Sequence, residues 1–389
     1  MSVELGSERI IFTDGLQPFV IRSAKGTLFV QAQLRFPPGY VPAARNAYPG
    51  IPGSVVSRDG GQTWARWVFK DKKSAGSYLP TESTNWNAVL TPAAVGPIFE
   101  GAAVPLRNGP VLLQEWIAPE GPDAAGWYDA QVWESHDDLE TFEGPIASRI
   151  HLPEGKGGFD DGGHPYSGLT FHRTILELPG GDLLACCYCW FKGDDTPCPY
   201  QPKMMKFRCV LLRSADRART WRYVSTIAVD PSIGEEGFNE PAMARLSKGP
   251  HSGRLVCLLR TGSNNCPIYQ AHSDDEGRTW SKPRPMGLHG VDPDVIEMAD
   301  GSLLALVGRR VLDDDNARQR GYYLALSRDA GESWQTVAKW NIEPHAAVGA
   351  TTYYGALREL EPGKLLAVYD VGFWTHPVRY IATREIRVR

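Results

Sequence analysis

An eight-residue motif recurs along the chain and limits the architectures that the chain can adopt. It reads Ser-x-Asp-x-Gly-x-Thr/Ser-Trp in three copies, which begin at Ser57, Ser273 and Ser327. Two eroded copies begin at Ser135 and Ser214; the first ends in Phe142, and the second has Ala218 where glycine is expected. Serine and aspartate side chains bond to the backbone of their own turn, and glycine accepts a positive φ. Each copy therefore predicts a hairpin turn whose last aromatic residue packs into an apolar layer.

A second phrase, made of an apolar strand, a glycine-containing turn and another apolar strand, accompanies these turns. It recurs six times, beginning at Pro18, Gly101, Thr174, Pro241, Asp294 and Ala356. Repeated units that each form a four-stranded meander are typical of a β-propeller. The short apolar stretch at residues 8–12 is expected to complete the last blade and close the ring, which removes open sheet edges. We therefore expect an all-β, six-bladed β-propeller that occupies residues 1–389 as one domain.

Composition argues against several classes of partner. Lys and Arg total 41 against 45 for Asp and Glu, a net charge of −4, which disfavours nucleic acid. No run reaches the roughly 18 apolar residues of a membrane helix, so we expect no membrane partner. The first residues lack the basic and apolar regions of a secretory signal, so the protein is expected to be cytoplasmic, or secreted with its signal removed. The oligomeric state stays open.

The seven cysteines are an odd number, so they cannot all pair within the chain. Cys186, Cys187 and Cys189 lie close together, but within an apolar strand pattern that sends successive side chains to opposite faces. Buried thiols are therefore a better interpretation than metal ligands. No metal or cofactor motif is present, and the sequence predicts none.

The octapeptides resemble the Asp-boxes of the sialidase (neuraminidase) superfamily, and the six units resemble its six-bladed propeller. The boxes of that family lie at the blade peripheries. The resemblance therefore implies a structural role for Asp59, Asp275 and Asp329. Since a fold alone does not assign a function, the chemistry is expected where the innermost strands of the blades begin, around the propeller axis.

Residues of the last three units match catalytic segments of that family. Glu240 resembles the acidic residue at the start of an innermost strand, and Arg260 the arginine that follows the next strand. Tyr354 matches the nucleophilic tyrosine, with Tyr353 as the alternative, and Asp370 stands where an acidic residue often follows.

A further arginine of the family, which binds the substrate carboxylate, matches Arg320, with Arg318 as the alternative. Such a pattern suits a sialic acid, whose anomeric carbon bears a carboxylate that arginines bind bidentately. A carboxylate nucleophile would be repelled there, so a neutral tyrosine activated by a glutamate is the better attacker. The resemblance thus implies that Glu240 acts as base towards Tyr354 while Arg260 and Arg320 clamp the substrate.

Two features depart from the family pattern. Gln17 stands where the first unit of a sialidase has an arginine. The following loop, residues 34–53, has no Asp or Glu to serve as general acid. Loss of a general acid costs a hydrolase about 10²–10⁴-fold in rate.

Other charged residues stand at corresponding places along the repeats. His172 and Arg173 directly precede the third repeat of the apolar phrase, at the position that Glu240 holds before the fourth. Alternation predicts that one of the two faces the axis and the other the blade stack. Asp292, with Asp294 beside it, begins the fifth unit. Arg310, with Arg309 before it, ends the paired strand of that unit. Trp374 is our preferred residue for stacking on a sugar ring.

The leading hypothesis is an exo-acting glycosidase of sialidase type that releases a terminal acidic sugar from a glycan. Tyr354, Glu240 and His172 are its candidate catalytic residues. Its candidate substrate-binding residues are Arg260, Arg320, Arg173, Arg310, Asp292 and Trp374. One alternative is a polysaccharide lyase acting at a uronate, with His172 or Tyr354 as base, because elimination does not need the missing carboxyl group. Another is a glycan-binding propeller without activity.

Overall fold

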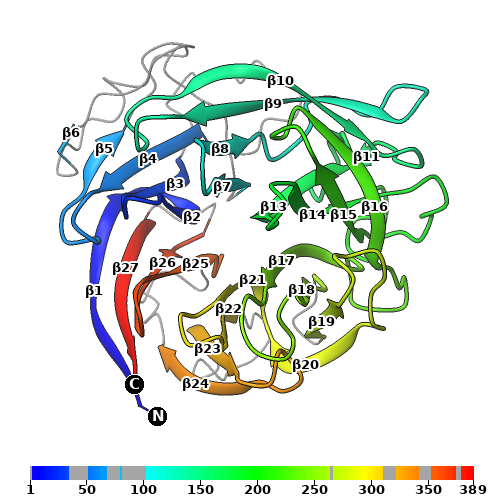
Figure 1. Cartoon of the computed structure of the whole chain (residues 1–389). Coiled ribbons are helices and arrows are strands. Elements are labelled where there is room, and N and C mark those ends of the chain that lie inside the picture. The colour runs from blue at the N-terminus through cyan, green and yellow to red at the C-terminus, as the bar shows by residue number, and fades with distance from the viewer. Residues whose placement is uncertain are drawn as a thin grey trace.

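The computed structural model describes residues 2–34, 51–67, 79–80, 102–262, 266–309, 321–340, 352–373 and 378–389. Every regular element in these ranges is a β-strand. Apart from one two-stranded hairpin, the strands group into six radial blades in a ring, and blades 2 and 3 are joined in one eight-stranded sheet (Figure 1). The predicted six-bladed, all-β propeller is thus confirmed. In the part of the chain that is described, no helix is long and apolar enough to cross a membrane.

The strands follow one another from the axis outward in each blade. Blade 1 contains β2 (Leu16–Arg22), β3 (Leu28–Leu34), β4 (Ile51–Ser57), β5 (Ala65–Trp67) and β6 (Leu79–Pro80). Blade 2 contains β7 (Ala103–Pro105), β8 (Val111–Gln114), β9 (Trp127–Ser135) and β10 (Glu143–His151). Blade 3 contains β13 (Leu169–Glu177), β14 (Leu183–Cys189), β15 (Arg208–Ser214) and β16 (Thr220–Ala228). A small hairpin precedes blade 3 and is formed by β11 (Gly158–Phe159) and β12 (Pro165–Tyr166).

Blade 4 contains β17 (Asn239–Arg245), β18 (Leu255–Arg260), β19 (Pro267–Ser273) and β20 (Arg284–His289). Blade 5 contains β21 (Val291–Glu297), β22 (Leu303–Arg309), β23 (Gly321–Ser327) and β24 (Gln335–Trp340). Blade 6 contains β25 (Gly355–Glu361), β26 (Lys364–Val371), β27 (Tyr380–Val388) and β1 (Val3–Thr13).

The first and last strands of the chain close the ring, as predicted. β1 pairs antiparallel with β27, from Val3 opposite Val388 to Thr13 opposite Tyr380, and the two termini lie side by side (Figure 1). Because the first strand of the chain forms the outer edge of the last blade, the two ends of the chain are held together within one sheet. A short parallel pairing of β10 with β16 also joins blades 2 and 3.

The core consists of apolar layers between neighbouring blades rather than a central core. Phe19 and Trp67 of blade 1, for example, pack against Leu113 and Phe142 of blade 2. Each of the other five pairs of neighbouring blades shares a buried cluster of this kind. Since every blade has two apolar faces and both are covered, each strand can be apolar on both sides and leave its ends for polar residues.

The octapeptides form the predicted turns between the third and fourth strands, at the periphery. In the first box, Ser57 Oγ donates to Asp59 Oδ1 at 2.8 Å, and the backbone N–H of Gly61 donates to Ser57 Oγ at 2.8 Å. The glycine position has a positive φ in all five copies, including 63° at Ala218 and 67° at Leu139.

The box tryptophans connect neighbouring blades. Trp221 Nε1 of blade 3 donates to Gln114 Oε1 of blade 2 at 3.1 Å. Trp334 Nε1 of blade 5 donates to Gln270 Oε1 of blade 4 at 2.7 Å. The boxes therefore act in packing. The strand-borne thiols of Cys186, Cys187 and Cys189 are buried and unpaired with other cysteines, as the apolar pattern predicted.

Candidate functional site

The innermost strands begin with residues in an unusual backbone conformation. Five non-glycine residues at these positions have a positive φ: Gln17 (52°), Arg173 (51°), Glu240 (39°), Asp292 (47°) and Tyr353 (59°). Each such residue costs on the order of 1–3 kcal/mol, and such strain concentrates at functional sites. The five belong to blades 1, 3, 4, 5 and 6, so the repeats place one strained residue each around the same axis.

A β-bulge produces this conformation. In blade 4, Asn239 pairs with Arg260 and Ala242 with Leu258, so Glu240 and Pro241 together oppose a single residue of β18. The equivalent shifts occur beside Gln17 in blade 1 and beside Asp292 in blade 5. All three bulged residues precede a proline, whose missing N–H suits a position without a ladder partner. The bulges turn side chains at the strand ends towards the axis.

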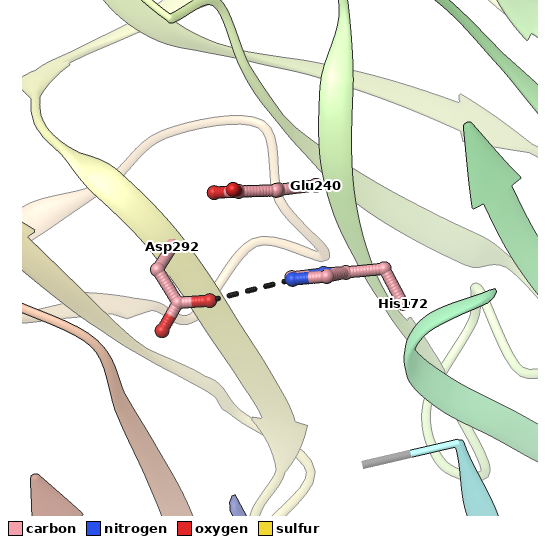
Figure 2. Close-up of side chains that lie close together, drawn as sticks. All are labelled: His172, Glu240 and Asp292. Atoms are coloured by element: carbon pink, nitrogen blue, oxygen red, sulfur yellow. Dashed lines mark ion pairs between the residues drawn. The ribbon is translucent and has the colours of Figure 1, made fainter. Parts of the chain in front are cut away.

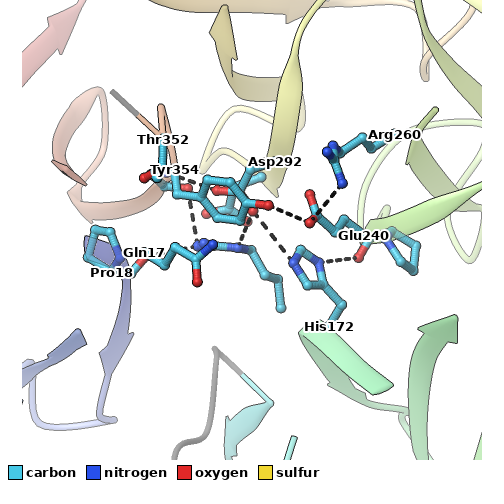
Figure 3. A network of polar contacts seen from close by, with 12 residues as sticks. Gln17, Pro18, His172, Glu240, Arg260, Asp292, Thr352 and Tyr354 are labelled. Carbon is cyan, nitrogen blue, oxygen red and sulfur yellow. Dashed lines mark hydrogen bonds and ion pairs between the residues drawn. The ribbon is translucent and has the colours of Figure 1, made fainter. Parts of the chain in front are cut away.

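Tyr354, Glu240 and Arg260 meet across blades 6 and 4 (Figure 3). The phenol of Tyr354 donates a short hydrogen bond to Glu240 Oε1. The same oxygen lies 2.9 Å from Arg260 Nη1. The other carboxylate oxygen, Glu240 Oε2, is buried and has no hydrogen-bond partner among the described residues. Tyr353, the sequence alternative, instead packs its ring 5.8 Å from that of Tyr322.

A second carboxylate holds Arg260 from the other side. Glu236 Oε2 lies 3.1 Å from Arg260 Nη1, and Asn239 donates to the same oxygen. Tyr200 donates its phenolic hydrogen to Glu236 Oε1 at 2.7 Å. Arg260 is therefore clamped between Glu236 and Glu240, and these charges hold its pKa well above the usual value despite burial.

Asp292 forms a second cluster of contacts, with His172 (Figures 2 and 3) and with Arg173. Arg173 Nε lies 2.6 Å from Asp292 Oδ1, and Arg173 Nη1 donates to the carbonyls of Pro18 and Gly355. His172 Nε2 lies 3.5 Å from the same carboxylate oxygen. The prediction that His172 and Arg173 face different ways is wrong, because the bulge between Phe171 and Ile175 interrupts the alternation and both side chains contact Asp292.

Asp370 anchors Tyr354 to blade 1. Its carboxylate accepts hydrogen bonds from the backbone N–H of Gln17 at 2.9 Å and of Tyr354 at 3.3 Å. The hydroxyls of Thr352 and Tyr322 donate to it as well. Gln17 thus joins the network through its backbone, and its side chain accepts a hydrogen bond from Gln33 at 2.8 Å. The first and last blades are fixed to each other beside the tyrosine.

Burial dominates the protonation equilibria of this site. It raises the pKa of Asp370 to about 6. It also raises the pKa of Glu240, against the opposing effects of Arg260 and of the hydrogen bond from Tyr354. Burial and the neighbouring Arg173 guanidinium hold the pKa of His172 well below its usual value, so the imidazole is neutral. Among the described residues, the site therefore contains the neutral imidazole of His172, the guanidinium groups of Arg173 and Arg260, and several carboxyl groups.

Three ligand-type side chains lie close enough to hold a cation (Figure 2). One atom each of His172, Glu240 and Asp292 lies within 4.8 Å of the others, and all three residues are buried. However, Arg260 already pairs with Glu240 and Arg173 with Asp292. Metal binding to these carboxylates would therefore compete with two ion pairs.

The remaining candidates from the sequence are either outside the described residues or structural, and two site residues were not candidates at all. Arg310, Arg318, Arg320 and Trp374 lie outside the described residues, as does most of the loop that follows β3. Asp294 has a structural role, because it accepts hydrogen bonds from Leu357 N at 2.7 Å and Arg358 Nη1 at 3.0 Å. Glu236 and Tyr200 escaped the sequence prediction, although Glu236 lies only four residues before Glu240.

Comparisons with known proteins agree with this fold. The family described as the BNR repeat-like domain matches residues 103–352. A sialidase of Micromonospora viridifaciens is 30% identical over 130 residues, which are 32% of this chain and 19% of that protein, so the match spans about a fifth of the relative's length.

Solved structures share the fold at low identity. The α-L-arabinanase of Penicillium chrysogenum superposes with a TM-score of 0.61 at 14% identity, covering 99% of this chain and 98% of that one. The Hadza microbial sialidase Hz136 superposes with a TM-score of 0.55 at 15% identity, covering 95% and 65%. A protein of unknown function from Dyadobacter fermentans gives a TM-score of 0.66 at 18% identity, with both chains fully covered.

Proposed function

The chain belongs to the BNR repeat-like domain family, and from that premise we propose that it is a glycoside hydrolase of sialidase type, which releases a terminal acidic sugar from a glycan. The observation that carries this proposal is the hydrogen bond from the phenol of Tyr354 to Glu240. Tyr354 and Glu240 are each 8% exposed, whereas Asp292 is fully buried. Of these three residues, the tyrosine and the glutamate keep the more accessible surface, and we take them as the groups that meet the substrate.

The reaction would proceed in two steps. The phenolic oxygen of Tyr354 attacks the anomeric carbon and its proton passes to Glu240, while the bond to the leaving group breaks and the leaving oxygen takes a proton from water. In the second step water attacks the same carbon, Glu240 returns its proton to Tyr354, and the proton of the attacking water passes to solvent. Arg260 forms an ion pair with Glu240, and the Arg173 guanidinium lies 5.8 Å from the centre of the Tyr354 ring. Both cations favour the phenolate that attacks.

The arginines at and near the site support a substrate whose terminal sugar carries a carboxylate. Arg260 presents a guanidinium beside the reacting pair, and its buried Nε has no hydrogen-bond partner among the described residues. Arg310 and Arg320, which the sequence assigns to the same task, lie outside those residues. Bidentate guanidinium contacts are the usual means of binding a carboxylate.

A neutral terminal sugar is the second candidate, because the two described arginines of the site are already neutralised. Arg260 pairs with Glu236 and Glu240, and Arg173 pairs with Asp292. A site with more carboxylates than arginines stabilises a cationic, oxocarbenium-like transition state, and it repels a substrate carboxylate. Structures with the same fold include an α-L-arabinofuranosidase of Fusarium graminearum, superposed with a TM-score of 0.57.

Aryl glycosides test the proposal directly, because a phenolic leaving group needs no general acid. We expect the protein to release 4-methylumbelliferone from its sialic acid glycoside, or 4-nitrophenol from its α-L-arabinofuranoside if the neutral candidate is right. Release from neither, with binding to immobilised glycans, would instead support a propeller that binds without turnover. If uronate-containing polysaccharides instead give an unsaturated uronate that absorbs in the ultraviolet, the reaction is elimination rather than hydrolysis.

A further inference from the structure

Two loops of blade 3 rise beside the site, at residues 152–168 and 190–207. They precede β13 and follow β14, whose ends pair with each other at Leu169 and Cys189. This is the end of the blade at which the innermost strand begins, the same end at which Glu240 and Arg260 stand in blade 4. We call these loops the blade-3 platform. Long loops that keep an ordered structure are usually functional.

The platform has a small apolar core of its own. Trp190, Cys198, Met204 and Phe207 are buried together. The rings of Trp190 and Phe207 stack with centroids 4.5 Å apart, and Trp190 Nε1 donates to the carbonyl of Met205 at 2.7 Å. Trp190 therefore lies in the core of the platform. A loop with its own core is preorganised, so a ligand need not order it.

Hydrogen bonds fix the platform to the site. The N–H of Phe207 donates to the carbonyl of Glu236 at 2.7 Å, and the hydroxyl of Tyr200 donates to the carboxylate of Glu236 at 2.7 Å. Glu236 in turn holds Arg260. The ring of Tyr200 is thus connected to the proposed catalytic glutamate through two side chains.

The platform exposes aromatic surface. Tyr200 is 51% exposed and Phe159 is 38% exposed; the other large exposed apolar residues of the described chain are aliphatic. Gln201 Nε2 donates to the carbonyl of Asp161 at 3.2 Å, and Lys203 Nζ lies 5.5 Å from the ring centre of Phe159. The two loops therefore contact each other, and polar groups border their aromatic rings. Rings that are held rigidly and bordered by hydrogen-bonding groups suit the apolar face and the hydroxyls of a sugar.

We propose that the blade-3 platform is the subsite for the leaving-group sugar, with the ring of Tyr200 as its stacking surface and Phe159 at its border. This inference rests on the proposed function, because it assumes that the bond cleaved lies beside Tyr354 and Glu240. The contacts from Tyr200 to Glu236 and from Glu236 to Arg260 join the platform directly to the proposed catalytic pair. A glycan bound with its terminal sugar at Tyr354 would therefore place its next sugar, the leaving group, on the platform.

A comparison of leaving groups tests the subsite. Sialyllactose and the methylumbelliferyl glycoside of sialic acid share the terminal sugar, but only sialyllactose has a leaving group that is itself a sugar. Arabinobiose and the nitrophenyl arabinofuranoside form the matching neutral pair. For the pair that is cleaved, we expect Tyr200→Ala to lower the ratio of kcat/KM for the oligosaccharide to kcat/KM for the aryl glycoside by about tenfold. Phe159→Ala should lower it by a smaller factor.

Two further variants complete the test. Tyr200→Phe keeps the ring but loses the bond to Glu236, so the ratio should stay near that of the wild type even if both rates fall. Ile10→Ala removes an equally exposed apolar side chain from β1 in blade 6 and should change neither rate. An unchanged ratio in folded Tyr200→Ala would overturn the subsite.

The proposed function and the subsite fail in different ways. If the wild type cleaves neither pair, the function fails. Calorimetric binding of lactose and arabinobiose then still tests the subsite. Weaker binding to Tyr200→Ala than to the wild type supports the subsite, and equal or undetectable binding to both contradicts it.

Discussion

Carboxylates gather in two regions of this propeller, in the Asp-boxes at the periphery and in the network at the axis, and their environments are opposite. Asp275 of a box is only partly buried, and hydrogen bonds from Thr279 and Ser273 lower its pKa to about 2. Asp370 at the axis is buried, and this burial raises its pKa to about 6. The carboxylate of a box is stabilised as an ion, whereas an axial carboxylate is held in a state that resists ionisation.

The two regions also differ in where their partners come from. Asp275 is bonded by residues within four positions of it in the sequence. Glu240 accepts a hydrogen bond from Tyr354, 114 residues away, and Asp370 accepts one from Gln17 across 353 residues. A carboxylate's role here therefore depends on burial and on distant partners rather than on residue type. Substitutions at the axis should therefore change activity as well as stability, whereas those in the boxes should change stability alone.

The largest effect is expected for Tyr354→Phe. Removal of the phenolic oxygen removes the proposed nucleophile, so kcat/KM for an aryl glycoside should fall by about four orders of magnitude while the far-ultraviolet circular dichroism spectrum is retained. Tyr369→Phe is the matched control in the same blade, because it breaks a phenol–carboxylate hydrogen bond of 2.7 Å to Glu8 away from the axis. Comparable losses in the two variants would show that Tyr354 acts through packing alone.

Asp370→Asn should change how stability depends on pH. The pKa of Asp370 in the folded protein, about 6, lies above its ordinary value of 3.8, so the native state binds more protons than the unfolded state between these values. The contribution of this group to stability is therefore complete below pH 4 and is lost as the pH rises through 6, by on the order of 3 kcal/mol. Urea unfolding at several pH values measures it. The difference between wild type and variant should vary between pH 4 and 6, and a constant difference would contradict the buried environment of Asp370.

Asp329→Ala should lower stability and leave activity unchanged. Asp329 Oδ1 accepts hydrogen bonds from Ser327 Oγ at 2.8 Å and from Ser333 N at 2.9 Å, both within its own turn. Their loss should reduce the free energy of unfolding by about 1–2 kcal/mol. Denaturant unfolding and aryl glycoside kinetics on the same preparation separate the two effects. A lower kcat without a loss of stability would mean that the box reaches the site.

The smallest effect is expected for Asp275→Asn, and it lies at the opposite end of the pH scale. The folded pKa of Asp275, about 2, lies below the ordinary 3.8, so its contribution is present above pH 4 and is lost as the pH falls towards 2. The free energy of unfolding of this variant, measured by urea unfolding at several pH values, should therefore depend less steeply on pH between 2 and 4 than that of the wild type. If the stabilities of variant and wild type differed in pH dependence only between pH 4 and 6, Asp275 would behave like Asp370, and the difference between the two regions would be refuted.

The sequence predicted the scaffold well because the scaffold repeats and its turns are local. Ser57, Asp59 and Gly61 bond within one octapeptide, so the turn can be recognised without the rest of the chain. The resemblance to sialidases also selected Glu240, Arg260 and Tyr354, which the fold brings together.

The parts that sequence reasoning missed depend on distant packing. Glu236 and Tyr200 lie in loops without a repeat, and their hydrogen bond joins segments that no periodic pattern connects. The orientation of His172 and Arg173 was mispredicted because simple alternation does not anticipate a bulge. A proline after Gln17, Glu240 and Asp292 was a visible sign of such bulges.

The central claim, that Tyr354 is the group that reacts with the sugar, can be tested by trapping the intermediate. A fluorinated sugar fluoride of the cleaved substrate forms glycosyl-enzymes that hydrolyse slowly, so the mass of the intact protein and a peptide map locate the attached sugar. The account predicts one sugar per chain, on Tyr354, and none on the Tyr354→Phe variant. A sugar attached to Glu240 or Asp292 instead, or turnover that accumulates no adduct, would contradict it.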